Sequence, residues 1–485
     1  MRLKTVLLVF AALLGAFLPA AAAGGNIVQQ YVDSTLKTDS RLRNAAVSLL
    51  AVDSRGRTVA EWNPDQPLLP ASTLKTVTTG AALLRLGPDF RFETRLATAG
   101  CVDSLGTLHG DLYIVGGGDP TLASETAVGQ SRDSVFALWT EALRGCGITA
   151  IEGRVVGDES IFSCDIIPEN WSWNNIGTDF GSGPCGLSFA DNCSRFLVRP
   201  GLCEGDSLFV TAVDSLCSGM TIDNEARTGA PGSGDRLAYY ASDLFPAGRF
   251  CGTYAVDRKA DTIAVSNKFP ALTLAETFSR HLCGEGIPCS GAAAGTAPDT
   301  AAYILEVKSP PLLEICRETN FQSNNFYAES IFMALGLALC GEASYSTAPK
   351  AVEDYLKSLG CDTRGLRQDD GCGLSRQNYL SPRFFCNYYN LMQKSAIFAQ
   401  YLSTFPTPGS EGTLKHLLGK EPQSLRRRIR CKSGSLSAVR CYAGYVESAG
   451  GEMLRFAIMV NNYDCPTGRI QPEIEGFLKR LALYE

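Results

Sequence analysis

Ser72 and Lys75, which lie three residues apart, are the first pair in the sequence that could do chemistry. Residues at this spacing share one face of a helix, so the hydroxyl and the amine can come within hydrogen-bond reach. A serine becomes a nucleophile when a neighbouring base takes its proton, and lysine can be that base once its pKa falls from about 10.4 toward neutrality. Burial or a second nearby cation causes such a fall. The pair therefore predicts a serine nucleophile with a lysine base.

Histidine-dependent and metal-dependent chemistry have little support in this sequence. Its three histidines are His109, His281 and His416, and it contains no Gly-x-Ser-x-Gly turn. None of the three lies in a cluster with metal-ligand spacing. The stretch 181–186 matches a dinucleotide-binding pattern, but it contains a proline and neither follows a clear strand nor begins a helix. We therefore expect neither a metal nor a cofactor.

A Ser-x-x-Lys motif is weak evidence by itself, because residues 34–38 and 72–76 have the same sequence. The first copy precedes any predicted strand pairing. The second follows a predicted hairpin over 45–62 and begins an apolar helix that Gly87 ends. A serine at a helix start is ordinarily a cap, but backbone N–H groups there can also stabilise an anion that develops beside it. We therefore expect function at Ser72 and coincidence at 34–38.

Two later segments complete a pattern with the Ser72 motif. Ser323-Asn324-Asn325 falls in a predicted turn between two helices, and Lys432-Ser433-Gly434 ends a predicted strand before a C-terminal hairpin. Taken alone, the first segment is typical of a helix cap and the second of a strand end with a turn. In this order, the three segments match the motif set of penicillin-binding proteins and class A β-lactamases.

With these motifs, the sequence resembles the D-alanyl-D-alanine carboxypeptidases and endopeptidases of the penicillin-binding protein 4 type. The long separation between the serine motif and residue 323 is typical of that family, which houses extra domains there. Segments 110–122, 370–375 and 412–414 are also similar to it. The resemblance covers nearly the whole mature chain. It implies an α+β fold: a penicillin-binding/β-lactamase-like transpeptidase domain, an antiparallel sheet flanked by helices, with inserted β-rich domains.

The resemblance also implies how an acyl group is transferred. Ser72 would attack the carbonyl of a terminal D-Ala-D-Ala peptide, and Lys75 would take its proton. Ser323 together with Lys432 would relay a proton to the leaving D-alanine. Water would then release the acyl-enzyme.

Binding roles follow from the same resemblance. Asn325 would hold the substrate amide, and the motif Lys432, Ser433, Gly434 with Ser435 would bind the substrate. A cation and hydroxyl groups suit the terminal carboxylate. The backbone N–H groups of the nucleophile and of Ser435 would form the oxyanion hole.

Two positions depart from the family pattern. The family usually has threonine where Ser433 stands, and serine keeps the hydroxyl. Cys372 stands where the Asp-Gly-x-Gly motif often has serine. We interpret this cysteine as a packed small residue without reactivity.

The implied function is a serine-type D-Ala-D-Ala carboxypeptidase, a hydrolase that acts on peptidoglycan stem peptides of the cell wall and is inhibited by β-lactam antibiotics. Whether it also cuts cross-links as an endopeptidase stays open. A β-lactamase would share the acylation step but deacylate rapidly; the chain length and the inserted region argue against it. A catalytically inactive wall-binding protein is a further alternative, and the presence of all three motifs argues against that.

The N-terminus reads as a signal peptide over residues 1–23. Arg2 and Lys4 precede an apolar run over 6–18, and three alanines follow at 21–23. The run is shorter than the ~20 residues that span a bilayer. We therefore expect an exported protein, periplasmic or secreted, without a stable membrane anchor.

A change in the pattern of predicted strands and helices along the chain predicts the domain organisation. Short strands separated by Gly, Asp and Pro turns occupy 93–268, which we interpret as an inserted β-rich region with an inner subdomain at about 160–225. The segments 24–92 and 269–485 on either side would form one catalytic domain.

Composition excludes one class of partner and leaves another question open. The net charge is −6 and no long basic block occurs, so nucleic acid is not an expected partner. The 18 cysteines make disulfides feasible in an exported chain, but they lack a C-x-x-C pair and their spacing does not reveal a pairing.

Overall fold

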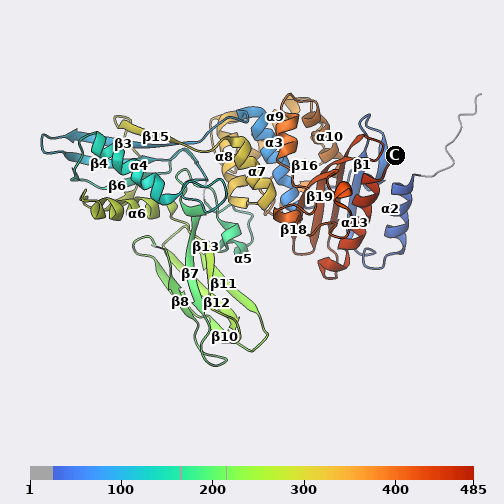
Figure 1. Cartoon of the computed structure of the whole chain (residues 1–485), viewed down its shortest axis with the longest axis horizontal. Coiled ribbons are helices and arrows are strands. Elements are labelled where there is room, and N and C mark those ends of the chain that lie inside the picture. Colours follow the sequence, from blue (N-terminus) through green and yellow to red (C-terminus); the bar gives the residue numbers. More distant parts are fainter. Residues whose placement is uncertain (1–25, 164–165, 215) are drawn as a thin grey trace, which may run out of the picture.

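The structure is a computed structural model that describes residues 26–163, 166–214 and 216–485. Figure 1 shows the first and last parts of the chain together in one body, and the middle of the chain in two further bodies. The predicted signal peptide lies outside the described residues. No helix in the described ranges has the length and apolar character needed to cross a bilayer.

A five-stranded antiparallel sheet forms the centre of the first body. Its strand order is β18-β19-β20-β1-β2, and β1 pairs with β20 over its whole length. The strands are β1 (Ala46–Val52), β2 (Thr58–Trp62), β18 (Ile429–Leu436), β19 (Val439–Glu447) and β20 (Met453–Asn461). The two ends of the chain therefore build one sheet, as the sequence predicted.

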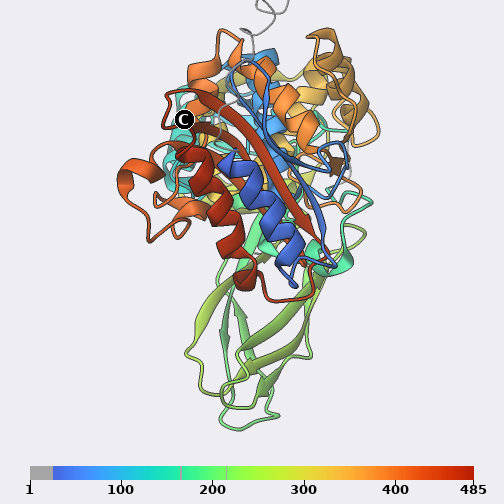
Figure 2. The same cartoon turned by 90° about the vertical axis from the view of Figure 1, so that its right-hand side faces the viewer.

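Helices cover both faces of this sheet, which explains why its central strands are apolar nearly throughout. On one face, α2 (Ile27–Thr38) and α13 (Gln471–Ala482) lie side by side, as Figure 2 shows. On the other, α10 (Pro382–Gln393) packs on β1 and β20. Behind it lie α3 (Lys75–Leu86), α7 (Leu312–Gln322), α8 (Asn325–Cys340), α9 (Ala348–Ser358) and α11 (Phe398–Ser403). Because α8 lies in the middle of these helices, it is buried from Phe326 to Gly336.

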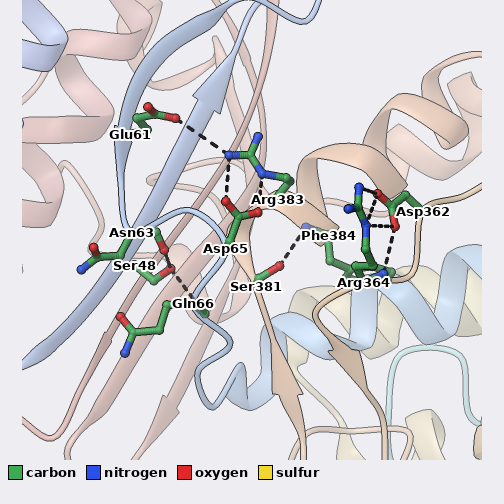
Figure 3. Close-up of polar contacts among 10 residues, drawn as sticks. All are labelled: Ser48, Glu61, Asn63, Asp65, Gln66, Asp362, Arg364, Ser381, Arg383 and Phe384. Atoms are coloured by element: carbon green, nitrogen blue, oxygen red, sulfur yellow. Dashed lines mark hydrogen bonds and ion pairs between the residues drawn. The ribbon is translucent and has the colours of Figure 1, made fainter.

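Polar contacts fix the start of α10 against the end of β2 (Figure 3). Arg383 Nε donates to Asp65 Oδ1 at 2.5 Å, and the Ser381 hydroxyl accepts the N–H of Phe384 as a helix cap. Across the β1–β2 connection, the Ser48 hydroxyl donates to the carbonyl of Asn63 at 2.6 Å. These contacts hold the α10 layer in register with the sheet that carries the site.

Among the described residues, the insertion contains three sheets, one in an outer body and two in an inner body. The outer body has the order β14-β6-β4-β3-β15, with β5 on β4. Its elements are β3 (Glu93–Val102), β4 (Thr107–Val115), α4 (Arg132–Gly145), β5 (Ala150–Ile151), β6 (Val155–Asp158), α6 (Pro270–Gly284), β14 (Ala292–Ala294) and β15 (Ala302–Lys308). The inner body has β7 (Cys193–Arg199), β8 (Phe209–Ala212), β9 (Thr221–Asn224), β10 (Arg227–Gly229), β11 (Asp235–Ala241), β12 (Ala247–Ala255) and β13 (Asp261–Ser266).

This pairing differs from the boundaries expected from sequence. The strands β14 and β15 lie after residue 268 but pair with β6 and β3 of the insertion. The inner strands run from β7 to β13, which is later than the expected 160–225. Strand partners that are distant in sequence leave no local signal, so composition alone does not reveal such limits. We propose that the insertion runs from β3 to β15.

Short elements connect these bodies to the site. They are α5 (Trp173–Ile176), β16 (Leu366–Arg367), β17 (Tyr379–Leu380) and α12 (Gln423–Arg426). The α5 segment and the turn after it reach from the insertion to the catalytic body, where the turn contacts α8.

Candidate active site

Ser72 lies in a single 3-10 turn, Ala71–Leu74, that runs directly into α3. This agrees with the prediction that Ser72 lies at a helix start. The residue before it, Ala71, has φ of 46°, a conformation that is costly for a residue with a side chain. The turn is held by tight packing, because Ala71 and Leu74 are completely buried. The nucleophile candidate is therefore fixed by a constrained backbone.

Lys75 brings three separate parts of the chain together. Its Nζ lies 2.9 Å from Ser72 Oγ, 2.6 Å from Asn325 Oδ1 and 2.9 Å from the carbonyl oxygen of Cys372. A neutral amine has two N–H groups and one lone pair. The Asn325 and Cys372 oxygens can only accept, so they take the two N–H groups. The lone pair is then left for the hydroxyl of Ser72.

Burial favours this neutral state. The Lys75 side chain is 0 % exposed, and burial lowers its pKa below the usual 10.5, opposed in part by the negative charge of surrounding acidic groups. The sequence predicted such a shift for a lysine base. Burial therefore makes the Lys75 amine easier to deprotonate than an exposed lysine, which favours its use as a base beside Ser72.

Lys432 is the second buried lysine of the site. Its side chain is 0 % exposed, and burial followed by the positive charge of Lys75 holds its pKa well below 10.5. Its Nζ donates to the carbonyl of Ser433 at 3.0 Å. The amines of Lys75 and Lys432 are thus close enough to interact electrostatically.

The Lys432 motif lies inside strand β18, which continues to Leu436 instead of ending at the motif. The motif glycine explains the position of this strand: a Cβ on Gly434 would lie 2.5 Å from the carbonyl of Pro70 and 3.1 Å from the nitrogen of Ser72. Only a glycine permits so close an approach. The strand therefore passes directly beside the nucleophile turn.

The geometry of β18 places the N–H of Ser435 on the free edge of the sheet. Because β18 is an edge strand, alternate N–H groups point away from β19. The N–H of Cys431 donates outward to Pro406, so the N–H groups two and four residues later point to the same edge. Ser433 lies on that alternation too, and its hydroxyl donates to Thr413 Oγ1 at 3.2 Å. The edge thus presents N–H donors and hydroxyls beside the nucleophile.

A loop at 370–375 forms the opposite wall. Gly373 has φ of 90°, and a Cβ there would lie 2.0 Å from the carbonyl oxygen of Ala71. The thiol of Cys372 is buried and its pKa is raised well above 9.0 by burial, so it is not nucleophilic. Its backbone carbonyl, not its side chain, contacts Lys75.

Two buried carboxyl groups hold this loop. Glu329 on α8 accepts the N–H groups of Gly371 and Cys372 at 3.0 and 2.7 Å, and burial raises its pKa to about 8. Asp370 accepts the N–H groups of Gly373 and Ser375 at 2.7 and 2.6 Å. Glu329 was not among the predicted site residues, although its position within the apolar, buried part of α8 indicates a carboxyl group that needs hydrogen-bond partners.

Glu329, Asp370 and Cys372 are close enough together to suggest a metal site, with ligand atoms within 4.8 Å of one another. The carboxylate oxygens, however, already accept hydrogen bonds from backbone N–H groups, and Asp370 also accepts from Trp171 Nε1 at 3.0 Å. These donors use the lone pairs that an ion would need. We interpret the group as the support of the loop.

Ser323 has no direct link to Ser72 or Lys75 among the described residues. It ends α7 in a left-handed conformation, φ 62°, in the predicted turn between two helices. Within the described ranges, its hydroxyl forms no hydrogen bond with Ser72, Lys75 or Lys432. Asn325 connects the turn to the site, accepting from Lys75 through Oδ1 and donating through Nδ2 to the carbonyl of Phe180 at 2.8 Å.

A cavity of about 420 Å³ opens over Ser72. Its wall combines the nucleophile, Asn325, the 370s loop, the β18 edge and the α5 segment of the insertion; the lining residues include Asn174, Phe180, Gly373, Arg376 and Ser435. The other Ser-x-x-Lys copy, by contrast, lies on α2 with Ser34 and Lys37 exposed to solvent. Tertiary structure thus distinguishes two identical peptides.

Known proteins resemble this chain over nearly its full length. The D-Ala-D-Ala carboxypeptidase 3 (S13) family matches residues 28–481. The D-alanyl-D-alanine carboxypeptidase DacB of Haemophilus influenzae is 26% identical over 437 residues, covering 89% of this chain and 87% of that protein. A D-alanyl-D-alanine carboxypeptidase of an Actinomadura species is 27% identical over 485 residues, covering 96% and 87%.

Solved structures show the same fold. The crystal structure of penicillin binding protein 4 from Haemophilus influenzae superposes with a TM-score of 0.82 at 24% identity, covering 94% of this chain and 99% of that one. The same protein complexed with a β-lactam gives a TM-score of 0.76 at 22% identity, covering 93% and 98%. The expected α+β fold class and the expected hydrolase activity class are confirmed. The chain belongs to the D-Ala-D-Ala carboxypeptidase 3 (S13) family of peptidases.

Proposed function

We propose that this protein cleaves the terminal D-alanyl-D-alanine bond of peptidoglycan stem peptides through an acyl-enzyme on Ser72. The observation that carries the proposal is the 2.9 Å contact between Lys75 Nζ and Ser72 Oγ in a buried setting. Family membership supports the substrate class. The predicted signal peptide supports a place of action outside the cytoplasm, periplasmic or secreted.

In the proposed acylation step, the Ser72 oxygen bonds to the carbonyl carbon of the penultimate D-alanine while its proton passes to Lys75. The backbone N–H groups of Ser72 and Ser435 stabilise the oxyanion. The C–N bond to the terminal D-alanine then breaks. The departing nitrogen receives a proton through Ser323 and Lys432, and water later hydrolyses the ester.

Substrate binding follows from the walls of the cavity. The Asn325 amide would exchange its contact with the Phe180 carbonyl for one with the substrate amide. The terminal carboxylate would lie at the β18 edge, where Lys432, Ser433 and Ser435 supply a cation and hydroxyl groups and Gly434 allows close approach. We propose no role for a metal or cofactor.

A labelled penicillin tests this proposal, because a β-lactam acylates the same serine. We expect stable labelling of the wild type and none of Ser72→Ala, with Ser34→Ala as the matched control that labels normally. We also expect release of D-alanine from purified pentapeptides. Rapid turnover of the penicillin would instead indicate a β-lactamase, and an absence of labelling would indicate an inactive wall-binding protein.

A further inference from the structure

Asn325 is held from two sides, and one of its two contacts comes from the insertion. Its Oδ1 accepts from Lys75 Nζ at 2.6 Å, whereas its Nδ2 donates to the backbone carbonyl of Phe180 at 2.8 Å. A side-chain amide has a donor end and an acceptor end, so the two partners together fix which end faces the lysine. The orientation of Asn325 therefore depends on the position of the Phe180 carbonyl.

A rotated Asn325 amide would disturb the catalytic pair. With its two ends exchanged, the amide would point its NH₂ group at Lys75 and donate to the lone pair of the neutral amine. In the observed arrangement, that lone pair is left for the hydroxyl of Ser72. By accepting Nδ2, the Phe180 carbonyl favours the orientation that leaves the lysine lone pair free.

The Phe180 carbonyl belongs to a short 3-10 turn, Asp179–Gly181, that contacts α8 from the side of the insertion. The turn packs closely on α5, because a Cβ on Gly181 would lie 1.8 Å from the carbonyl oxygen of Asn175. The carbonyl of Gly181 directly follows that of Phe180 in the chain. A group that fixes the Gly181 carbonyl therefore also limits where the Phe180 carbonyl can point.

A buried lysine of the insertion binds this turn. Lys268 lies in the short link between β13 and α6, is 5 % exposed, and donates from Nζ to the carbonyl of Gly181 at 2.9 Å. Among the described residues, this carbonyl is the one hydrogen-bond acceptor of Nζ. Burial of an amine is costly unless it is hydrogen-bonded, so the contact with the turn compensates for the burial of Lys268.

The backbone that carries Lys268 is itself fixed within the insertion. The hydroxyl of Ser266 donates to the carbonyl of Ile176 at 2.7 Å, and the N–H of Asn267 donates to the carbonyl of Asn192 at 2.8 Å. Burial lowers the pKa of Lys268 to about 8, but the ammonium and the neutral amine both keep N–H groups. The donor therefore stays in place on either side of that pH.

We infer that Lys268 is a positioning residue for Asn325. It fixes the carbonyl of Gly181, the turn then presents the carbonyl of Phe180, and Asn325 keeps its oxygen toward the lysine base. Lys268 does not line the active-site cavity, so it acts through the turn and not by contact with substrate. This inference rests on the proposed function.

Positioning of this kind should change the substrate concentration that is needed and not the limiting rate. In the proposed reaction, the bound substrate amide takes over the contact with the Asn325 nitrogen and orders the side chain. In the free enzyme, a loosened turn lowers the fraction of molecules in which Asn325 is correctly oriented, and the apparent affinity falls by that fraction. A loss of folded protein would instead reduce the amount of labelled enzyme and leave the half-saturating concentration unchanged.

Lys268→Met tests the inference, because methionine is an unbranched apolar side chain that cannot donate to the Gly181 carbonyl. Stopped-flow acylation by a chromogenic β-lactam over a range of concentrations measures both constants. We expect the half-saturating concentration to rise at least fivefold and the limiting rate constant to stay within twofold of the wild type. Lys268→Gln, whose side chain is shorter by one bond, should give the same rise and serves as the test if the methionine variant does not fold.

Lys259→Met is the matched control, because Lys259 lies exposed in the turn between β12 and β13 and its loss removes the same charge from the same body. Both of its constants should equal those of the wild type. The route through Asn325 is tested in an Asn325→Ala background, where Lys268→Met should change the half-saturating concentration by less than twofold.

Two results would overturn the inference and leave the proposed function standing. One is a half-saturating concentration that stays at the wild-type value in the Lys268 variants. The other is a rise in the Asn325→Ala background equal to the rise in the wild-type background, which would show that Lys268 does not act through Asn325. A wild type that the β-lactam does not acylate would overturn the proposed function, and this inference with it.

Discussion

The amine of Lys75 lies 2.6 Å from the side-chain oxygen of Asn325, although 250 positions separate the two residues in the chain. This contact orients the Asn325 amide so that its nitrogen points out of the catalytic pair, toward the Phe180 carbonyl. One asparagine thus orders the base and presents a donor where a substrate amide can bind.

Replacing the base should abolish most acylation while leaving the fold intact. Lys75→Met removes the amine but keeps an unbranched apolar side chain in a fully buried site. Loss of general-base catalysis costs about 10²–10⁴-fold, so we expect the rate of penicillin labelling to fall by that factor. Circular dichroism should report an unchanged fold. Lys37→Met, in the exposed copy of the motif, should label at the wild-type rate.

The pH dependence of acylation should reveal the lowered pKa of Lys75. The base works only when neutral, so the rate should rise with pH and reach a plateau once Lys75 has lost its proton. Because burial lowers this pKa, the plateau should begin below 10.5. Stopped-flow labelling with a chromogenic β-lactam would measure the profile. A labelling rate that still rises through pH 10.5 would show that the pKa of the Lys75 amine is not lowered.

Gly373→Ala should damage the site through sterics. The new Cβ would lie 2.0 Å from the carbonyl oxygen of Ala71, which would push the loop away from the nucleophile turn. We expect penicillin labelling to fall by at least tenfold. Gly360→Ala is the matched control: it has φ of 81° and no atom within 4 Å of the added Cβ. Its free energy of unfolding should fall by only the ~1–2 kcal/mol that an alanine in the left-handed conformation costs, and penicillin should label it as it labels the wild type.

Glu329→Gln should change how stability depends on pH. In the folded protein, burial raises the pKa of Glu329 from its usual 4.5 to about 8. Between these values the folded state holds a proton that the unfolded state releases, so this group's stabilising contribution is present below about 4.5 and is lost as pH rises toward 8. Glutamine does not titrate. Urea unfolding at pH 5 and pH 8 should therefore show a smaller loss of free energy of unfolding in the variant, and equal losses would contradict the shift.

One cysteine pair is positioned to form a cross-link. The thiols of Cys283, at the end of α6, and Cys289 lie 3.9 Å apart, and Cys283 is exposed. Oxidised glutathione should convert the two thiols into a disulfide by exchange, with release of two reduced glutathione molecules. Peptide mass spectrometry should find residues 283 and 289 joined with the loss of two hydrogens. Persistence of both free thiols after this treatment would contradict the expectation, and Cys283→Ser should never form the link.

The motifs determined much of this protein from sequence alone. Ser72, Lys75, Asn325 and Lys432 could be proposed as site residues because helix spacing and turn chemistry are local properties and the order of the motifs can be followed along the sequence. The sheet built from both chain ends followed from the short apolar strands at the two ends of the sequence. The same local reasoning could not choose between the identical peptides at 34–38 and 72–76 without the context around them.

Tertiary structure decided the rest, because it depends on contacts between residues far apart in the chain. Burial of Lys75 under α8 lowers its pKa, and the support of its loop by Glu329 has no signature in the local sequence. The strand β15 pairs with β3, which lies about 200 residues earlier in the chain, and composition alone does not reveal such a pairing. Local chemistry supplied the reacting groups, and long-range packing set their protonation, their orientation and the cavities around them.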